Sequence, residues 1–506
     1  MRLRSCGVAA TLVVAACSSS STGPRANPDV FLAGNHQSDT VFATLPQQLV
    51  VRIKIPSGQS PSGHVVRFAS PPDTKPNLSN LLFGNQVYFG PGSQPVDVTW
   101  NDTTSTAAEV SVIITLGAQG GTVPVVITVP EFGYVDTATF TVLPGGAAMV
   151  VAAPADTAMY TGTSFKYHSY TADRYGNPRT DNLNYAVDSG PVTMSGATAT
   201  AGVLGYATVA IVSPKYGFTA NATIAVVPHG TLAASTGQSI VTFNLDGSGR
   251  QTIVQAAVVG YLKWDPAGTH IAYDGTVPCS GDLSWFSTTD LHGNTQRIVD
   301  GAGFQGGNYD DQYPSYSHDG TWIYYSQVEQ AGEETGRLRR VHIDGSGDTL
   351  VLGGGLNYYP APAPDNIHVA YVAASYNYTS GLGVLDVTTG VADTLGVSAW
   401  SPEWSPTGNQ IAFLTPLGCT GNIAVISPTG GTAHVLSSAT YQAGFDWSPD
   451  GQWIVAANAT TGILNLINAT TGQTIPLSYA KALGSPAWQP GSSPSTNRVS
   501  NKLGHK

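Results

Sequence analysis

The sequence predicts an all-β protein in which two tandem β-sandwiches are followed by a six-bladed β-propeller. In the C-terminal half, one strand-and-turn phrase recurs at intervals of about 40–50 residues, which is the period of propeller blades. In the N-terminal half, a strand–turn–strand pattern occurs twice, and its prolines Pro130 and Pro214 lie 84 residues apart. The composition, with 58 Gly and only 10% charged residues, agrees with twisted sheets and tight turns.

The propeller phrase is clearest at residues 404–413 and 447–456, which read Trp-Ser-Pro-Thr/Asp-Gly-x-x-Ile. A short strand ends at the aromatic residue, proline presets φ, and glycine accepts a positive φ, so a tight turn and an antiparallel strand follow. We interpret the recurring tryptophans as residues that pack the blades. The copies begin at six anchors, spaced by 52, 46, 42, 43 and 41 residues: Trp264, Tyr316, Pro362, Trp404, Trp447 and Trp488.

The strand count predicts how the propeller closes. Six outer hairpins are present but only five complete inner strand pairs, because a polar tail follows Trp488. A strand at Thr231–Ala234 can supply the missing partner, so that the sixth blade holds strands from both ends of the segment. Such closure leaves no open sheet edge. The sequence therefore predicts a propeller over residues 230–491 and a disordered tail over 492–506.

The repeat phrase resembles the WD-like repeat of the TolB-like propellers, a family that includes the periplasmic protein of the Tol–Pal system and many lipoproteins. The resemblance covers about half of the chain and is specific for the fold. Propellers of this kind serve as scaffolds, as receptors and as appendages to peptidases. The resemblance therefore implies a fold and a cell-envelope setting, and it leaves the activity open.

Two sandwich domains are predicted ahead of the propeller, over residues 29–146 and 147–229. Each copy has an alternating strand, a Pro-x-aromatic-Gly-aromatic turn and a second alternating strand. Residues 172–178, Ala-Asp-Arg-Tyr-Gly-Asn-Pro, resemble the Asp-x-x-Gly-Asn-Pro phrase of bacterial Ig-like domains. That resemblance implies Ig-like β-sandwiches, which act as spacers. We interpret the phrase itself as a tight turn rather than an adhesion motif.

The chain begins with the pattern of a bacterial lipoprotein signal. A basic start precedes a short apolar run, and Val14-Ala15-Ala16-Cys17 resembles a lipobox, whose cysteine becomes the lipid-modified N-terminus. The alternative is an ordinary signal peptide with a chance cysteine. We predict a signal peptide over 1–16, lipidation of Cys17 and a serine-rich tether over 17–28, and Ser18 favours the outer membrane. No later run approaches the ~20 apolar residues of a membrane span, so the protein is expected to be membrane-anchored.

The charge balance argues against nucleic acid as a partner. The formal net charge is −11 at pH 7, and it becomes −13 when the two arginines of the predicted signal are removed. Nucleic-acid binding needs a basic face, which this composition does not supply. The acidic residues are spread along the chain, so they point to no particular basic partner.

Two cysteines, Cys279 and Cys419, remain after the predicted signal and lipidation site. Each lies 8 residues beyond the isoleucine of a second blade strand, Ile271 or Ile411, in the loop that follows. The two loops should share one face of the ring but belong to opposite blades, whereas a disulfide needs Cα atoms within ~7 Å. An extracytoplasmic compartment favours pairing. A Cys279–Cys419 disulfide and two separate thiols both stay open.

Signatures of catalysis and of metal binding are missing from the sequence, so we predict no catalytic residue, no metal and no cofactor. There is no Gly-x-Ser-x-Gly elbow, no His-Glu-x-x-His and no Cys-x-x-Cys. The densest polar cluster contains Asp310 and Asp311, which should lie in a loop on the face of the Cys279 and Cys419 loops. Two interpretations stay open: a candidate binding face for a cation or basic peptide, or a solvated loop.

These observations favour a membrane-anchored, non-enzymatic binding or scaffold protein of the cell envelope. The propeller face would recognise an envelope protein, a peptide or a glycan, and the Ig-like domains would act as spacers. The alternative is an enzyme, a lyase or hydrolase that acts on polysaccharide in the propeller channel. Inward-facing clusters of His, Arg and carboxylates would favour the enzyme, and a mouth lined by Tyr, Asn and Ser would favour binding.

Overall fold

The computed structural model describes residues 31–70, 81–83, 99–255, 259–275, 285–299, 309–329, 336–374, 380–415, 418–482 and 484–491. These residues contain strands β1 to β44, one 3-10 turn at Pro130–Phe132 and no α-helix, which confirms the all-β class. None of the described segments is a helix long and apolar enough to span a membrane. The predicted signal peptide, tether, Cys17, Cys279 and tail lie outside the described residues.

The chain divides into two compact units, Met1–Met149 with Tyr170–Asp181, and Val150–Ser169 with Asn182–Lys506. The first unit has a five-stranded sheet of order β2-β10-β9-β4-β6 and a three-stranded sheet of order β1-β3-β7. Every second side chain of β9 is buried, as in a strand with one face on a core. The strands are β1 (Phe31–Ala33), β2 (Ser38–Thr40), β3 (Leu49–Arg52), β4 (Val65–Ala69), β5 (Leu81–Phe83), β6 (Thr99–Thr103), β7 (Glu109–Val112), β8 (Ile114–Leu116), β9 (Gly121–Val129), β10 (Tyr134–Leu143), β14 (Tyr170–Asp173) and β15 (Pro178–Arg179).

The Asp-x-x-Gly-Asn-Pro phrase forms a turn between β14 and β15, as predicted, with Gly176 at a φ of 85°. Its side chains also fasten the turn to the rest of the first unit. The Asp173 carboxylate accepts the backbone N–H of Gly145 at 2.9 Å, and the Asn177 amide donates to the carbonyl of Ala118 at 2.7 Å. Burial opposes the charge of Asp173, but the hydrogen bonds that its carboxylate accepts from Asn177 and from the Gly145 N–H outweigh burial and lower the pKa of the carboxyl group.

The second unit begins with a smaller pair of sheets, of order β12-β20-β19-β16 and β13-β18-β17. Val209 and Ile211 of β19 and Ile224 of β20 are fully buried between them. The chain passes from the first unit to the second within β11. The strands are β11 (Ala147–Val151), β12 (Asp156–Tyr160), β13 (Ser164–Lys166), β16 (Asn184–Ser189), β17 (Val192–Ser195), β18 (Thr198–Ala201), β19 (Gly205–Val212) and β20 (Thr219–Val227).

The repeat of 84 residues corresponds to two hairpins in the same register. In the β9–β10 hairpin Val125 pairs with Ala138, and in the β19–β20 hairpin Val209 pairs with Ala222. Both final strands also pair in parallel with a short early strand, β10 with β2 and β20 with β12. The sequence repeat is therefore a repeat of strand pairing.

Residues 231–488 form a β-propeller of antiparallel sheets. Four sheets have the orders β23-β22-β21-β44, β24-β25-β26-β27, β28-β29-β30-β31 and β32-β33-β34-β35, and a short β38–β40 pairing joins the groups β36–β39 and β40–β43. The strands are β21 (Thr231–Ser235), β22 (Ser239–Asn244), β23 (Gln251–Gln255), β24 (Leu262–Trp264), β25 (His270–Asp274), β26 (Phe286–Asp290), β27 (Thr295–Val299), β28 (Tyr309–Tyr316), β29 (Trp322–Glu329), β30 (Gly336–His342), β31 (Thr349–Leu352), β32 (Leu356–Pro362), β33 (His368–Ala374), β34 (Ser380–Asp386), β35 (Ala392–Thr394), β36 (Trp400–Trp404), β37 (Ile411–Thr415), β38 (Thr420–Ile426), β39 (His434–Val435), β40 (Tyr441–Trp447), β41 (Trp453–Asn458), β42 (Ile463–Asn468), β43 (Thr474–Lys481) and β44 (Pro486–Trp488).

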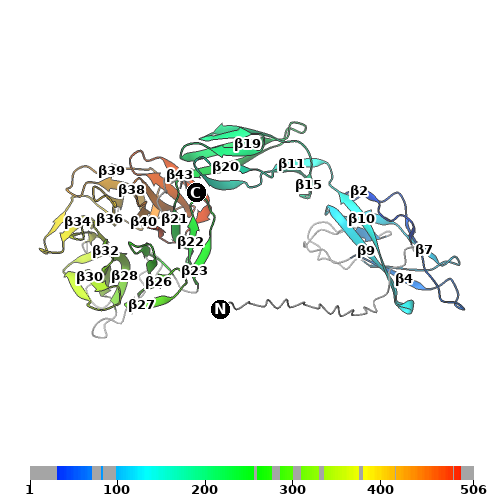
Figure 1. The fold of residues 1–506 in the computed structure, drawn as a ribbon, viewed down its shortest axis with the longest axis horizontal. Coiled ribbons are helices and arrows are strands. Elements are labelled where there is room, and N and C mark those ends of the chain that lie inside the picture. The colour runs from blue at the N-terminus through cyan, green and yellow to red at the C-terminus, as the bar shows by residue number, and fades with distance from the viewer. Residues whose placement is uncertain are drawn as a thin grey trace, which may run out of the picture. The chain divides into compact units, whose positions relative to one another are not determined.

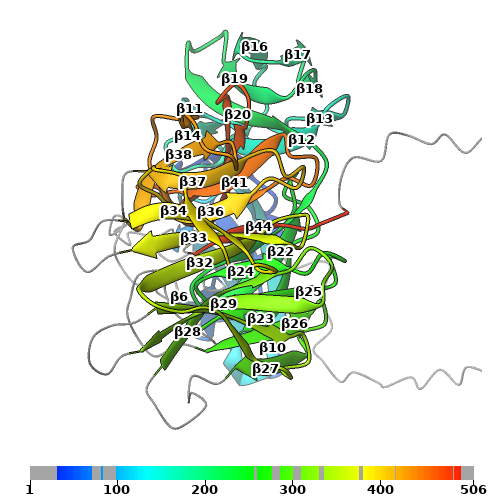
Figure 2. The same cartoon turned by 90° about the vertical axis from the view of Figure 1, so that its left-hand side faces the viewer.

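The two ends of the propeller segment meet in one sheet. Strand β44 pairs with β21, with Trp488 opposite Leu232 and Pro486 opposite Ala234, which is the pairing that the strand count predicts. The first strands of successive sheets contact each other from β24 through β28, β32, β36 and β40 to β44, and β44 returns to β24. Figure 1 shows β36 and β40 on the inside of this ring and β34 and β39 on its outside, and Figure 2 shows β32, β33 and β34 side by side.

The turn chemistry of the repeat is visible in the copy at 447–456. The Ser448 hydroxyl accepts the N–H of Trp453 at 2.9 Å and contacts the Asp450 carboxylate at 2.5 Å, while Gly451 has a φ of 68°. In the copy that begins at Pro362, Asn366 takes the place of this glycine with a φ of 59°. Asparagine is among the few residues that tolerate the left-handed region, so the turn persists without glycine.

Candidate functional site

The inner strands of the propeller bring side chains from distant parts of the chain together at the axis. The residue just before each anchor forms one layer, and the residue three positions before it forms a second layer. The first layer contains Lys263, Ser315, Ala361, Glu403, Asp446 and Ala487. The second layer contains Tyr261, Tyr313, Tyr359, Ser401, Gly444 and Ser485.

Bulges in four inner strands set these layers. Tyr313, Tyr359, Ser401 and Gly444 all have positive φ, of 59°, 53°, 49° and 85°, and the strand register shifts at each. Positive φ in a tyrosine is costly, on the order of 1–3 kcal/mol, and is kept where the surroundings impose it. Side chains of the preceding group of strands accept three of the four backbone N–H groups at these bulges; for example, the Tyr313 N–H donates to Asp274 at 3.1 Å. Bulges of this kind often re-aim side chains beside a functional site.

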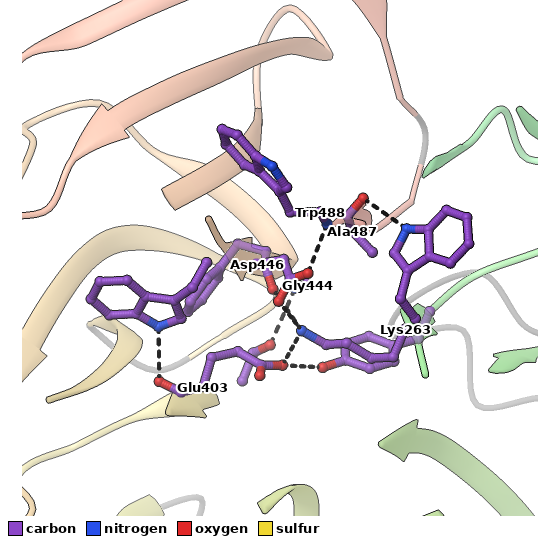
Figure 3. A network of polar contacts seen from close by, with 11 residues as sticks. Lys263, Glu403, Gly444, Asp446, Ala487 and Trp488 are labelled. Carbon is purple, nitrogen blue, oxygen red and sulfur yellow. Dashed lines mark hydrogen bonds and ion pairs between the residues drawn. The ribbon is translucent and has the colours of Figure 1, made fainter. Parts of the chain in front are cut away.

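A buried ion network lies in the first layer (Figure 3). The Lys263 ammonium of β24 is 2.7 Å from Oε1 of Glu403 on β36 and 2.9 Å from Oδ1 of Asp446 on β40. It also donates to the backbone carbonyl of Phe445 at 3.2 Å. The three acceptors use all three N–H bonds of the ammonium group. Lys263 therefore links the inner strands β24, β36 and β40 and has no further donor to offer.

The two carboxylates of the network are held differently. Asp446 uses Oδ1 for Lys263 and Oδ2 for the backbone N–H of Trp488 at 2.8 Å. Glu403 receives both Lys263 and the hydroxyl of Tyr261 on the same oxygen, Oε1. Its second oxygen, Oε2, has no hydrogen-bond partner among the described residues. Glu403 thus keeps one acceptor free although its side chain is only 9% exposed.

Burial controls the protonation of this network. Burial is the main cause that raises the pKa of Glu403, and it outweighs the opposing effect of Lys263. Burial also opposes the charge of Lys263, but Asp446 and Glu403 outweigh it and raise the pKa of the ammonium group. Burial, followed by Glu403, raises the pKa of Tyr261 well above its usual value, so its hydroxyl keeps its proton and donates. The network holds one cation against two carboxyl groups.

A pocket of about 240 Å³ opens onto this layer. Its wall consists of the aromatic anchors and of the prolines two positions after them, with His318 at the equivalent position of one copy. The tryptophans therefore do more than pack the blades as predicted, because they also form the pocket wall. The lining residues are Lys263, Trp264, Pro266, Ser315, Tyr316, His318, Pro362, Pro364, Glu403, Trp404, Ser405, Pro406, Asp446, Trp447, Ser448, Pro449, Trp488 and Pro490.

Tyrosines fill the next layer inward. The rings of Tyr313 and Tyr359 stack at 3.8 Å between centroids, and Tyr261 packs edge-on against Tyr313 at 5.8 Å. The Trp400 indole donates to the Tyr359 hydroxyl at 3.1 Å. All three tyrosines are buried. The lining of the pocket accordingly ends at the Lys263, Glu403 and Asp446 layer.

Asp310 and Asp311 do not lie in a loop, so that prediction is wrong. Both belong to β28, where Asp310 pairs with Val328 and Asp311 with Gln327, and they are 1% and 0% exposed. Asp311 accepts a hydrogen bond from the Gln327 amide at 3.0 Å. They sit at the beginning of β28, whereas the pocket meets its end at Tyr316. Their role in binding stays a prediction.

The Cys279–Cys419 pairing stays a prediction. Cys419 is disulfide-bonded, while Cys279, its predicted partner, lies outside the described residues. The same holds for Cys17, so lipidation stays a prediction. Among the described residues no group of three or more His, Cys, Asp or Glu side chains could hold a metal ion.

Comparison with known proteins yields distant similarity. No family model matches the chain. An uncharacterized protein of Agrobacterium fabrum is 28% identical over 167 residues, which is 30% of this chain and 53% of that protein, so the chain spans about half the length of this relative.

The similarity to solved structures is also distant. TolB from Acinetobacter baumannii has a TM-score of 0.43 at 16% identity and covers 60% of this chain and 82% of its own. Putative TolB from Agrobacterium tumefaciens has a TM-score of 0.38 at 15% identity, over 49% and 88%. A gluconolactonase from Xanthomonas campestris has a TM-score of 0.36 at 11% identity, over 46% and 83%. At these TM-scores, the propeller assignment rests on the sheet pairing in this chain.

Proposed function

We propose that this chain is a non-enzymatic binding protein of the cell envelope whose recognition site is the pocket at the propeller axis. The observation that carries the proposal is the Lys263–Glu403–Asp446 network. Lys263 and Asp446 are committed to contacts within the protein, which suits a rigid, pre-formed site. Within the network, Oε2 of Glu403 is the carboxylate oxygen that accepts no hydrogen bond from the described residues, and aromatic and proline side chains surround it. Few fixed polar groups in an apolar wall are typical of binding pockets.

The proposal includes the finer architecture. The closed ring of inner strands supports a six-bladed, TolB-like propeller, and the paired sheets ahead of it support two Ig-like sandwiches. Ala225 and Val227 of β20 share a buried core with Leu477 of β43 and Trp453 of β41, so the second sandwich is a firm base for the propeller. Lipidation of Cys17 would anchor the chain to the membrane, with the outer membrane favoured and the Ig-like domains as spacers.

One observation favours the enzymatic alternative. Glu403 is a carboxyl group with a raised pKa beside a pocket, and such groups serve as general acids. A lyase or hydrolase acting on polysaccharide would use Glu403 in that role. It would need a second reacting group at the pocket, for which His318 and Tyr316 are the remaining titratable candidates in the lining.

The test compares retention of envelope proteins and glycans on immobilised full-length protein with retention on Glu403→Gln. A matched control, Glu131→Gln, removes the same charge from the first unit. We expect one reproducible component to be retained by the wild type and the control and lost from Glu403→Gln, with no product formed. Equal retention by all three proteins would place recognition elsewhere. Turnover of an envelope glycan that Glu403→Gln abolishes would replace binding by catalysis.

A further inference from the structure

The floor of the pocket carries more negative than positive groups. Lys263 offers one positive charge, and the carboxyl groups of Glu403 and Asp446 offer two negative charges when both are ionised. All three N–H bonds of Lys263 are used within the protein, so the ammonium group cannot turn toward a ligand. An anion entering the pocket would meet carboxylates and no free donor from Lys263. The indole N–H groups of Trp404 and Trp488, which have no partner among the described residues, are neutral and do not offset this charge. The charge of the floor therefore selects against anions and favours cations.

Glu403 supplies a specific contact for a cation. Its Oε1 atom already accepts Lys263 and Tyr261, and its Oε2 atom has no partner in the described part of the chain. An acceptor that is largely buried and unpaired costs free energy, which a ligand donor can recover. Because Glu403 lines the pocket, a donor that enters can reach this carboxylate. A charged donor forms the stronger hydrogen bond with it.

The wall suits the stem of a long basic side chain. Trp264, Trp404, Trp447 and Trp488 come from four different copies of the repeat and line the same pocket. Tryptophan faces attract ammonium and guanidinium groups, and the methylene stems of Lys and Arg pack on apolar surfaces. A volume of about 240 Å³ lies below the ~300–1,000 Å³ of sites for drug-sized ligands. The pocket therefore fits one side chain rather than a large ligand.

We propose that the pocket receives the ammonium or guanidinium end of a lysine or arginine side chain from a partner peptide or protein, with Oε2 of Glu403 as its acceptor. This inference rests on the proposed binding function and names the chemical class of its ligand. The basic residue would enter between the proline turns and pass the tryptophans to the charged floor. Specificity would come from two matches: the apolar stem of the basic side chain packs against the tryptophan and proline wall, and its charged end meets the acidic floor of the pocket.

The test uses the full chain and four blocked peptides of sequence Gly-Ser-X-Ser-Gly, in which X is lysine, arginine, norleucine or glutamate. Norleucine keeps the stem of lysine and removes its charge. Calorimetric titration should give binding of the lysine or arginine peptide on the order of tenfold or more tighter than the norleucine peptide. Glu403→Gln should lose this preference, and Glu131→Gln should keep it.

A second variant separates pocket access from charge. Ser315 lies in the same layer as Glu403 and lines the pocket, so Ser315→Phe should block entry while leaving the ion network intact. If Glu403→Gln fails to fold, the comparison of lysine with norleucine on the wild type still decides the matter. Equal affinity for the two peptides, or no measurable binding of either basic peptide, would overturn the cation assignment. If the cation assignment fails, retention of a neutral glycan would still support the proposed binding function. Turnover of that glycan would overturn the binding function as well as the cation assignment.

Discussion

Replacing Lys263 by methionine should destabilise the propeller strongly. The substitution keeps the length and apolar stem of the side chain but leaves Glu403 and Asp446 facing each other without a cation. The side chains of Lys263, Glu403 and Asp446 are 8%, 9% and 18% exposed. Removing one partner of a buried ion pair costs about 3–5 kcal/mol. Because Asp446 is partly exposed, we expect a loss near 3 kcal/mol.

The assay is thermal unfolding of the full chain followed by tryptophan fluorescence. Eight of the 9 tryptophans lie in the propeller segment, so the signal reports that part of the molecule. A loss near 3 kcal/mol corresponds to a fall of roughly 6–12 °C in the midpoint. The matched control is Lys481→Met in β43, where the lysine is exposed, and we expect a change within about 0.5 kcal/mol.

A triple variant distinguishes loss of charge balance from loss of packing. Lys263→Met combined with Glu403→Gln and Asp446→Asn removes all three charges, and neutral replacement of a buried ion cluster often restores stability. We expect it to recover most of the lost midpoint. A Lys263→Met protein that unfolds within 2 °C of the wild type would refute the account of a buried, coupled network.

Four further predictions concern closure, backbone strain, the disulfide and pH. Truncation before Ser485 should lower the unfolding midpoint far more than truncation before Ser492, because it removes β44 and its pairing with β21; equal midpoints would contradict the shared sheet. In the same fluorescence assay, Gly444→Ala should lower the unfolding midpoint more than Gly390→Ala. Both glycines have positive φ, but only at Gly444 would the new Cβ overlap a neighbouring atom, Ser485 Oγ. Equal falls in the midpoint would show that Ser485 moves aside without cost. Peptide mapping without reductant should link Cys419 to Cys279, and a free Cys279 thiol would overturn that pairing. Affinity for the lysine peptide should rise as pH increases through the raised pKa of Glu403, because the ionised carboxylate is the acceptor. The charged or titratable neighbours of Glu403 are Lys263, Asp446 and Tyr261. The rise should persist in His318→Asn, and a pH-independent affinity would count against Glu403.

The propeller could be predicted because its determinants are local. Each turn uses a serine, a proline and a residue of positive φ in a fixed order, and these act within five or six residues of one another. The pairing of β44 with β21 followed from a count of strands, since one anchor strand lacked a partner. The copy that begins at Pro362 was also recognisable, from Pro364 and Asp365 in its turn. The structure adds that Asn366 replaces glycine there in the left-handed region.

The pocket was not predicted, because its members are far apart in the sequence. Lys263, Glu403 and Asp446 meet only when the ring closes, and no local motif joins them. A signal was nevertheless present. A charged residue immediately precedes three of the six anchors, at a strand position where the other copies have serine or alanine. Charges at such a position indicate a shared axial layer, since equivalent positions of a propeller face the same axis.

The prediction that Asp310 and Asp311 lie in a loop failed because it relied on local sequence preference. Two adjacent aspartates have low strand propensity and suggest a loop, but propensity yields to tertiary context. In the structure the inner strand β28 begins at Tyr309 and its pairing with β29 includes both aspartates. The sequence shows that Asp310 and Asp311 are polar, but their burial depends on the packing of β28 in the closed ring.

A crystal structure of the full chain with the Gly-Ser-Lys-Ser-Gly peptide would show whether the pocket receives a basic side chain. We expect electron density for the lysine side chain between the tryptophans of the pocket, with its ammonium group within about 3 Å of Glu403 Oε2. The Lys263–Asp446 contact should be unchanged, because binding uses a pre-formed site. A lysine bound outside the pocket, or an ammonium group that avoids Glu403 within it, would contradict the account.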